Sequence, residues 1–315
     1  MYPAVVHHLR CPVCRAELTA APDTDAVPDA AVSPDAAATP EAAAPQAQAA
    51  SGAALRCPAG HSFDVARQGY VDLTGGHLTH AGDTAEMVAA RAALLGAGHY
   101  RPLADAIVAV AGRYAPPGLV VDIGAGTGYY LHALLAARPT DPGLALDVSK
   151  AALRRAGAAH PRLAAVRADA WRRLPVADGT ASLLLDAFAP RSGAEFRRIL
   201  RPDGALVVVT PTDDHLRELV EAAGLLTVDR AKQERLAAAL RRWFIMIHAE
   251  YVSWPLRLSQ EEARALVAMG PSAHHADPVG TAGALAALGS PVAVGASVRL
   301  TIWRPRPEPE EHRGL

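Results

Sequence analysis

The sequence predicts an α/β protein, in which helices cover both faces of a mostly parallel β-sheet and a small N-terminal module comes first. From Leu119 onward, short apolar segments alternate with segments of helical periodicity, a pattern typical of parallel sheets. Two Cys-containing motifs lie near the N-terminus, and an Ala- and Pro-rich stretch separates them. With 315 residues, 50% of them hydrophobic, the chain is long enough for one large domain and one small one.

We expect the chain to divide into four regions: 1–80, 81–118, 119–304 and 305–315. The first is a metal-binding module with a disordered insert at 20–54, whose composition cannot bury enough apolar surface to offset the entropy of ordering. The second is a helical linker region of two helices that packs on the large domain, since its apolar residues recur at helical spacing. The third is the α/β domain itself, and the fourth is a flexible tail.

The strands expected in the large domain are short apolar runs: "LVVDIG", "LALDV", "LAAVRAD", "ASLLLDAFAP" and "ALVVVTP". Segments of helical spacing follow the first, second, fourth and fifth of these runs: Tyr129–Ala137, Lys150–Ala159, Gly193–Leu200 and Asp213–Ala223. Two later strands, "WFIMIHAEYVSWPLRL" and "ASVRLTIWRP", flank a helical region from Ser259 to Met269. We expect the last strand to be antiparallel.

The charge of the chain limits its possible partners. A formal net charge of -1 excludes a wholly basic surface, so a nucleic acid would have to bind a local patch. No apolar stretch is long enough to span a membrane, and the N-terminus lacks the apolar core of a signal peptide. We therefore expect a cytoplasmic protein with no membrane partner.

Two knuckles provide a possible metal site. Cys11-Pro-Val-Cys14 and Cys57-Pro-Ala-Gly-His61 supply three thiolates and one imidazole, a complete tetrahedral zinc set with no position left for water. Such a zinc ion is structural, and it would staple a module too small for a core of its own. The alternative is that the cysteines are free thiols beside a histidine that falls there by chance, since the chain has 13 histidines.

A glycine-rich turn follows the first strand of the large domain. In "VVDIGAGTGYY", Asp122 precedes Gly124, Gly126 and Gly128, and glycines allow the backbone to approach a ligand closely. An NAD site would require a glycine where Tyr129 lies. The pattern instead resembles motif I of class I S-adenosylmethionine-dependent methyltransferases.

Two further acids follow the next strands, Asp147 in "LALDVSK" and Asp169 in "VRADAW". The same resemblance implies that Asp147 accepts hydrogen bonds from both ribose hydroxyls of the cofactor and that Asp169 accepts one from the adenine amino group. The alternatives are a helix N-cap for Asp147 and a turn residue for Asp169.

Taken together, the two parts of the chain resemble the RlmA family of 23S rRNA guanine-N1 methyltransferases, in particular its tylosin-resistance branch. The resemblance covers nearly the whole chain apart from the insert. The segments that carry it are "CPVC", "CPAGHSFDVARQGYVDL", "GDTAEMVAARAALLGAGHYRPL", "DIGAGTGYY", "LDVSKAAL" and "FAPRSGAEFRRILRPDG".

The family resemblance implies a class I Rossmann-like sheet of seven strands and a zinc-ribbon-like domain that helps to grip an rRNA hairpin. It also implies a homodimer that binds RNA and no DNA. In that family the methyl group goes to N1 of a guanine in a loop that lines the peptide exit tunnel, and in some members this blocks macrolide binding.

Residue roles at the substrate end remain open at this point. Asp186 is a candidate general base, against the alternative of a solvated carboxylate at a strand end. Phe188 begins the aromatic-Ala-Pro motif of the family and is a candidate to stack on a flipped base, against the alternative of a core side chain. Arg91, His99 and Tyr100 lie in a family-type segment and are candidates to border the cofactor, against ordinary helix-end positions.

For RNA binding, the candidates are the arginines near the knuckles, Arg10, Arg15, Arg56 and Arg67, whose alternative is a solvated surface in an arginine-rich chain. Two other functions stay open: a non-catalytic zinc-ribbon RNA-binding protein, and a small-molecule methyltransferase, because fold does not fix function. The intact acids and glycines of the cofactor motif argue against the first, and the zinc module argues against the second.

Overall fold

The computed structural model describes residues 1–21, 53–76, 78, 82–224, 230–269 and 278–307. Most of the insert predicted at 20–54 and most of the tail predicted at 305–315 lie outside these residues. Among the described residues, none of the helices is both long and apolar enough to cross a membrane.

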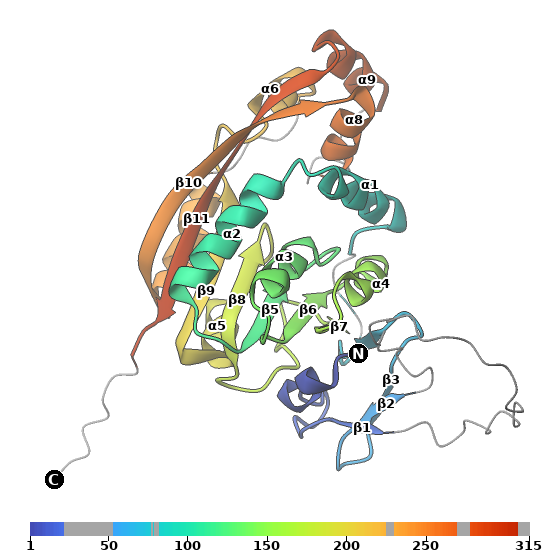
Figure 1. Ribbon diagram of the computed structural model, residues 1–315, viewed down its shortest axis with the longest axis vertical. Helices are drawn as coiled ribbons and strands as arrows, with labels where there is room; N and C mark the ends of the chain where they lie inside the picture. The colour runs from blue at the N-terminus through green and yellow to red at the C-terminus, as the bar shows by residue number, and fades with distance from the viewer. Residues whose placement is uncertain (22–52, 77, 79–81, 225–229, 270–277, 308–315) are drawn as a thin grey trace, which may run out of the picture.

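An eight-stranded sheet forms the centre of the molecule, in the order β10-β11-β9-β8-β5-β6-β7-β4 (Figure 1). The strands are β4 (Tyr70–Asp72), β5 (Leu119–Ile123), β6 (Gly143–Asp147), β7 (Leu163–Arg167), β8 (Ala181–Ala187), β9 (Leu200–Pro211), β10 (Phe244–Leu258) and β11 (Val292–Pro305). Strands β4 to β9 run parallel to one another. The last strand, β11, is antiparallel to β9 and to β10, as predicted. The seven predicted strands are present, and β4 adds an eighth.

Helices cover both faces of the sheet: α1 (Ala85–Gly96), α2 (Arg101–Tyr114), α3 (Tyr129–Ala137), α4 (Lys150–Ala159), α5 (Gly193–Ile199), α6 (Arg217–Ala222), α7 (Arg230–Arg241), α8 (Gln260–Ala268) and α9 (Pro278–Ala287). Helices α1 to α4 share one apolar core with the sheet, and α5 shares the other. The helix predicted from Asp213 begins only at Arg217, because Leu216 adopts a left-handed φ of 58° that cannot continue a helix. Helices α7 and α9 were not predicted.

The N-terminal module consists of a 3-10 turn (Pro3–His8) and a small antiparallel sheet of β1 (Thr19–Ala21), β2 (Ala54–Arg56) and β3 (Ser62–Asp64). Its buried side chains belong to the same apolar core as one face of the large sheet. Strand β4 continues from the module and pairs with β7. The module is thus built onto the edge of the large sheet, which explains how so small a unit buries its apolar residues.

Candidate functional site

A cavity of about 510 Å³ opens at the carboxyl ends of the parallel strands. This is the edge at which ligands bind in open α/β sheets, because loops there diverge to both faces. Among the predicted cofactor residues, the following line the cavity: Arg91, Tyr100, Asp122, Gly124, Gly126, Asp147 and Asp169. Residues from the ends of three adjacent strands, β5, β6 and β7, therefore meet there with residues from the helical region.

The glycine turn needs its glycines for two different reasons. Gly124 and Gly126 both have left-handed φ values, 66° and 55°. A Cβ on Gly124 would lie 2.8 Å from the Cβ of Ala189, so a side chain there would collide with the loop after β8. Gly128 does not line the cavity; it has a φ of 78° and caps α3, and a Cβ there would lie 3.2 Å from Ala156 Cα in α4. Its role is therefore close helix packing, not ligand contact.

The Asp147 carboxylate holds the turn in place. Its Oδ2 accepts a hydrogen bond from Gly126 N–H at 2.8 Å, and its Oδ1 accepts one from Ser149 N–H at 2.8 Å. Burial raises the pKa of Asp147, and these two N–H groups oppose that shift. A carboxylate has about four acceptor sites, so both oxygens keep capacity for the hydroxyls of a ribose. The N-cap of α4 is Ser149, not Asp147.

One carboxylate oxygen of Asp169 has no hydrogen-bond partner within the described part of the chain. Its Oδ1 accepts a hydrogen bond from Trp171 N–H at 2.9 Å, as a turn residue would, but its Oδ2 is buried and has no hydrogen-bond partner among the described residues. Arg172 Nε lies 3.7 Å from that oxygen, which is beyond hydrogen-bond distance. Because buried acceptors are normally paired, the free oxygen suits an amino donor such as the adenine N6 group.

Charges are concentrated at this end of the cavity. Asp122 is buried, and burial together with the nearby carboxylates of Asp147 and Asp186 raises its pKa well above the usual range. Arg91 forms an ion pair with Asp83, and both line the cavity. S-adenosylmethionine carries a sulfonium, an ammonium and a carboxylate group. Carboxylates and one guanidinium line this end of the cavity, so groups of both signs are available to it.

The structure separates Tyr100 from His99, two of the three residues predicted from the helical region. Tyr100 lines the cavity, and its ring lies edge-on to Trp254 at 5.5 Å between centroids. His99 is not among the lining residues: its Nε2 lies 2.8 Å from Glu262 in α8, and its carbonyl accepts a hydrogen bond from the Trp254 indole. His99 therefore holds α8 against the start of α2.

Phe188 and Asp186 also occupy different places. Phe188 lines the cavity, is 43% exposed and has a φ of 60°, a rare conformation for a bulky residue. Asp186 does not line the cavity; it is fully buried, and its Oδ1 accepts a hydrogen bond from Arg191 Nε at 3.0 Å. Burial raises its pKa to about 7, against the opposing effect of Arg191. Asp186 is therefore not a solvated carboxylate at a strand end, and its position does not favour direct contact with a substrate in this cavity.

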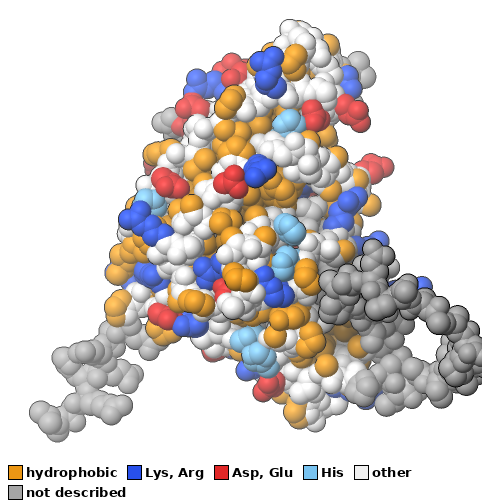
Figure 2. All heavy atoms as spheres, viewed as in Figure 1, with side chains coloured by type: hydrophobic (Ala, Val, Ile, Leu, Met, Phe, Trp, Pro, Cys, Tyr) orange, Lys and Arg blue, Asp and Glu red, His pale blue; other side chains and the backbone are white. Residues whose placement is uncertain are grey.

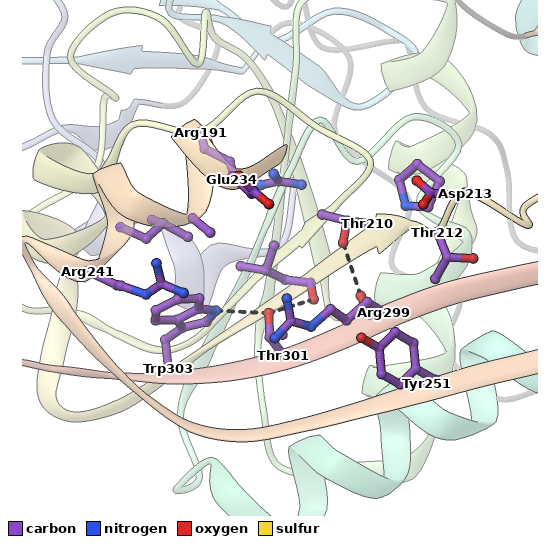
Figure 3. A pocket seen from close by; sticks show the side chains of 14 residues that line it. Arg191, Thr210, Thr212, Asp213, Glu234, Arg241, Tyr251, Arg299, Thr301 and Trp303 are labelled. Carbon is purple, nitrogen blue, oxygen red and sulfur yellow. Dashed lines mark hydrogen bonds between the residues drawn. The ribbon is translucent and has the colours of Figure 1, made fainter. Parts of the chain in front are cut away.

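Arg191 leads to a second cavity of about 310 Å³ (Figure 3). Its polar side chains come mostly from β9, β11 and α7, and the Trp303 indole donates to Thr301 Oγ1 at 2.9 Å within it. The charge of Arg191 is balanced by its ion pair with Asp186, which does not line the second cavity. The other charged residues that line this cavity are two basic and two acidic ones: Arg241, Arg299, Asp213 and Glu234. This balance gives the second cavity no excess charge to attract an anion.

Sequence reasoning missed several residues of the first cavity: Asp83, Trp171, His215, Leu216, Leu266 and Met269. Most of them lie in loops or on α8, far in sequence from the glycine motif, and no local pattern marks them. His215 could have been found from the sequence, because it lies in the polar turn that directly follows the strand "ALVVVTP".

The two knuckles come together as predicted. One ligand atom from each of Cys11, Cys14, Cys57 and His61 lies within 4.8 Å of the other three. The Cys14 and Cys57 sulfurs are 3.6 Å apart, and His61 Nδ1 lies 3.3 Å from Cys57 Sγ and 3.6 Å from Cys11 Sγ. Zn–S bonds of about 2.3 Å give a tetrahedron with edges of about 3.8 Å, so the set fits zinc with only small shifts.

The four arginines predicted to meet RNA divide into two pairs. Arg56 and Arg67 are exposed. Arg10 instead donates to the carbonyls of His7 and Leu9, and Arg15 has a buried Nη1 with no hydrogen-bond partner among the described residues. Figure 2 shows basic and acidic side chains interspersed over one face of the molecule, as the near-zero net charge implies.

We predict one zinc ion per purified chain, because a closed four-ligand set couples metal binding to folding of the module. Changing Cys14→Ser should reduce the zinc content to well below one per chain, measured by mass spectrometry of the metal. A His132→Ala variant, altered on α3 away from the cluster, should keep its zinc. Zinc-free wild-type protein from a fresh purification would contradict the assignment.

We also predict that Asp147→Ala weakens S-adenosylmethionine binding by about 100-fold, since hydrogen bonds to a charged group contribute about 1.5–3 kcal/mol each and the glycine turn loses its tether. Calorimetry measures the change directly. Asp105→Ala, on the exposed face of α2 with 71% side-chain exposure, is the matched control and should bind normally. Equal affinities in the two variants would remove Asp147 from the site.

Comparison with known proteins agrees with this geometry. A family model described as "RlmA, N-terminal" matches residues 45–75, and one described as "Methyltransferase domain" matches residues 120–204. A protein of Micromonospora griseorubida, named as a 23S rRNA (guanine-N(1)-)-methyltransferase, is 50% identical over 97% of this chain and 100% of its own length. The 23S rRNA (guanine(748)-N(1))-methyltransferase of Streptomyces fradiae is 44% identical over 96% of this chain and 99% of its own.

These matches extend over both the N-terminal module and the methyltransferase domain of this chain. S-adenosylmethionine and a structural zinc ion are accordingly its cofactors. Such identity over nearly the full length of both proteins shows common descent, and the chain belongs to the family of 23S rRNA (guanine-N1)-methyltransferases.

Proposed function

We propose that this chain transfers the methyl group of S-adenosylmethionine to N1 of a guanine in a hairpin loop of 23S rRNA near the peptide exit tunnel. The full-length relatives named for this activity carry the proposal. In a host whose macrolide site includes that guanine, the methyl group would give resistance. The reaction would take place in the cytoplasm, where the ribosome is assembled.

The two ends of the cavity suit the two reactants. Asp147 and Asp169 would hold the ribose and the adenine, and the Arg91 side chain with Asp122 would face the methionine part. At the other end, the exposed ring of Phe188 offers a stacking surface for a base turned out of its helix. Holding N1 in line with the methyl sulfonium supplies much of the acceleration by proximity alone.

Asp186 fits a positioning role better than that of a general base. It pairs with Arg191, five residues further along the chain. Strand β8 fixes one end of the segment between them, and the ion pair fixes the other. Phe188 lies within that segment, and its N–H donates to the Val209 carbonyl at 3.2 Å. The buried pair would hold the Phe188 backbone in its left-handed conformation and so fix the position of the aromatic ring.

The zinc module would extend the RNA-binding surface beyond the cavity. Cys11, Cys14, Cys57 and His61 would hold the metal, which orders both knuckles. The module contacts the loop that follows β7: Leu9 forms a β-bridge with Val176, and Arg10 N–H donates to the Pro175 carbonyl at 3.0 Å. Trp171 in the same loop lines the cavity and is 58% exposed. One RNA hairpin could therefore contact the module and enter the cavity.

A homodimer is part of the proposal, and strand β10 offers a surface for it. This strand lies at the edge of the sheet and carries exposed apolar side chains: Ile245, Met246, Ile247 and Tyr251. Clustered apolar side chains at a surface mark protein contacts, and an edge strand can pair with its own copy about a twofold axis.

The proposed activity is tested with purified protein, S-adenosylmethionine and 23S rRNA from cells that lack the gene. We expect one reverse-transcriptase stop at a single guanine, because a methyl group on N1 blocks base pairing. Asp147→Ala should give no stop at the same enzyme concentration. Binding of rRNA without methylation would indicate a non-catalytic RNA-binding protein, and the absence of both would favour a small-molecule substrate.

We further predict that changing Arg56→Gln and Arg67→Gln together weakens binding of the rRNA and reduces the slope of its salt dependence by up to about two, because each arginine would neutralise one phosphate. Affinity for S-adenosylmethionine should not change. Arg113→Gln together with Arg257→Gln, two exposed arginines outside the module, is the matched control. An unchanged salt slope would show that the module does not bind phosphates through these side chains.

A further inference from the structure

His215 lies at the end of the cavity opposite the predicted adenine site, in the loop between β9 and α6. Its ring lies beside that of Phe188, with 6.0 Å between the centroids and an angle of 34° between the planes. Neither the cofactor motif nor the zinc module accounts for it. His215 thus lies beside Phe188, the ring on which the target guanine would stack in the proposed function.

The backbone on both sides of this end is held in unusual conformations. Three non-glycine residues among those described have a left-handed φ: Arg15, Phe188 and Leu216. The last two both line this cavity, and Leu216 directly follows His215. The Leu216 N–H donates to the Gly295 carbonyl at 2.8 Å, which fixes the loop against β11. Such conformations in bulky residues concentrate at functional sites, where surrounding contacts impose them.

The proton on the His215 ring can be assigned from its contacts. The Ser297 backbone N–H donates to His215 Nδ1 at 3.1 Å, so Nδ1 is an acceptor and carries no proton. Burial lowers the pKa of His215 to about 4. The ring is therefore neutral near pH 7, with its proton on Nε2.

The charged groups around this loop do not alter that assignment. On the loop and on α6, Asp214 is paired with Arg217, and Glu218 accepts a hydrogen bond from Gly295 N–H of β11 at 3.1 Å. Asp213 is exposed. The other charged residues of the cavity lie on the cofactor side: Asp83, Arg91, Asp122, Asp147 and Asp169. None of the charged groups on the described residues contributes to the lowered pKa of His215.

A hydrogen-bond donor at one particular atom of the base would assist the proposed reaction. Guanine N1 bears a proton, which must pass to water before or as N1 forms its bond to the methyl carbon. The sulfonium S–CH₃ bond breaks in the same step, leaving S-adenosylhomocysteine and N1-methylguanine. Loss of the N1 proton places negative charge on N1 and on the neighbouring O6, and a donor fixed at O6 stabilises that charge.

We propose that His215 Nε2–H donates a hydrogen bond to O6 of the target guanine and stabilises the anion that attacks the methyl group. This inference rests on the proposed function. His215 is suited to the part because it is a neutral donor set in a rigid loop. It is not suited to be the base, since Nδ1 is already occupied and Nε2 already bears the proton. A donor at O6 also selects guanine over adenine, whose amino group at that position is itself a donor.

The first experiment compares His215→Leu, His215→Gln and a His132→Leu control in single-turnover methylation of 23S rRNA. We expect His215→Leu to be slower by about 100-fold, as for removal of one donor from an oxyanion site. His215→Gln, whose amide is a donor, should recover part of the rate, and the control should behave as wild type. Calorimetry should show unchanged S-adenosylmethionine affinity in all three.

A pH profile separates this part from a structural one. As the pH approaches the range in which guanine N1 ionises by itself, the deficit of His215→Leu should shrink, because the donor is needed less. Replacing O6 of the target guanine by sulfur, a weaker acceptor, should reduce the ratio of wild-type to His215→Leu rates. A wild-type rate in His215→Leu, or a deficit that is constant with pH and equal for oxygen and sulfur, would overturn the proposal.

The two proposals fail in distinguishable ways. If the wild-type protein does not methylate 23S rRNA, the proposed function fails and the His215 variants are not reached. If it does, and His215→Leu matches it in rate, only the hydrogen bond to O6 is refuted.

Discussion

The hydrogen bonds of the Asp147 carboxylate are the constraint on which the cofactor end of the cavity depends. Strands β5 and β6 run parallel in register, so the end of β6 lies beside the turn that leaves β5. Asp147 accepts the Gly126 N–H there and fixes a turn whose left-handed residues would otherwise be free to move. Asp169 lies one strand further along the same edge, with one carboxylate oxygen that has no hydrogen-bond partner among the described residues. A site suited to an extended nucleoside thus follows from the strand order together with these two carboxylates.

The other end of the cavity is built by a different means. Two loops, after β8 and after β9, carry bulky residues in left-handed backbone conformations, and tertiary contacts hold both. The buried Asp186–Arg191 pair anchors the first loop, and hydrogen bonds to β11 anchor the second. The second loop is thus held by β11, the last strand in the sequence, which is antiparallel to β9. A rigid end would suit the proposed reaction, in which placement of N1 matters more than movement of protein groups.

The N-terminal module is not an independent domain in its packing. Its buried side chains, Leu9, Leu18 and Leu55 among them, share a core with β5, β6 and α5. Strand β4 adds the module's chain to the sheet beside β7, and Arg167 of β7 pairs with Asp72 at 2.7 Å. Zinc would fix the two knuckles, while the shared core fixes their orientation toward the cavity. If the module binds RNA as proposed, those contacts would act on a rigid frame, which would help to select one hairpin.

The sequence by itself determined the α/β alternation, each of the two Cys-containing knuckles, and the glycine turn with its preceding acid, because each depends on local spacing. Periodicity also indicated the two helices of the region 81–118. It could not place β4 in the large sheet or bring His215 beside Phe188, since both depend on contacts between segments more than 25 residues apart. Only the tertiary structure showed that His99 does not line the cavity and that Asp186 is buried against Arg191. The direction of a side chain at a strand or helix end is set by its neighbours in space.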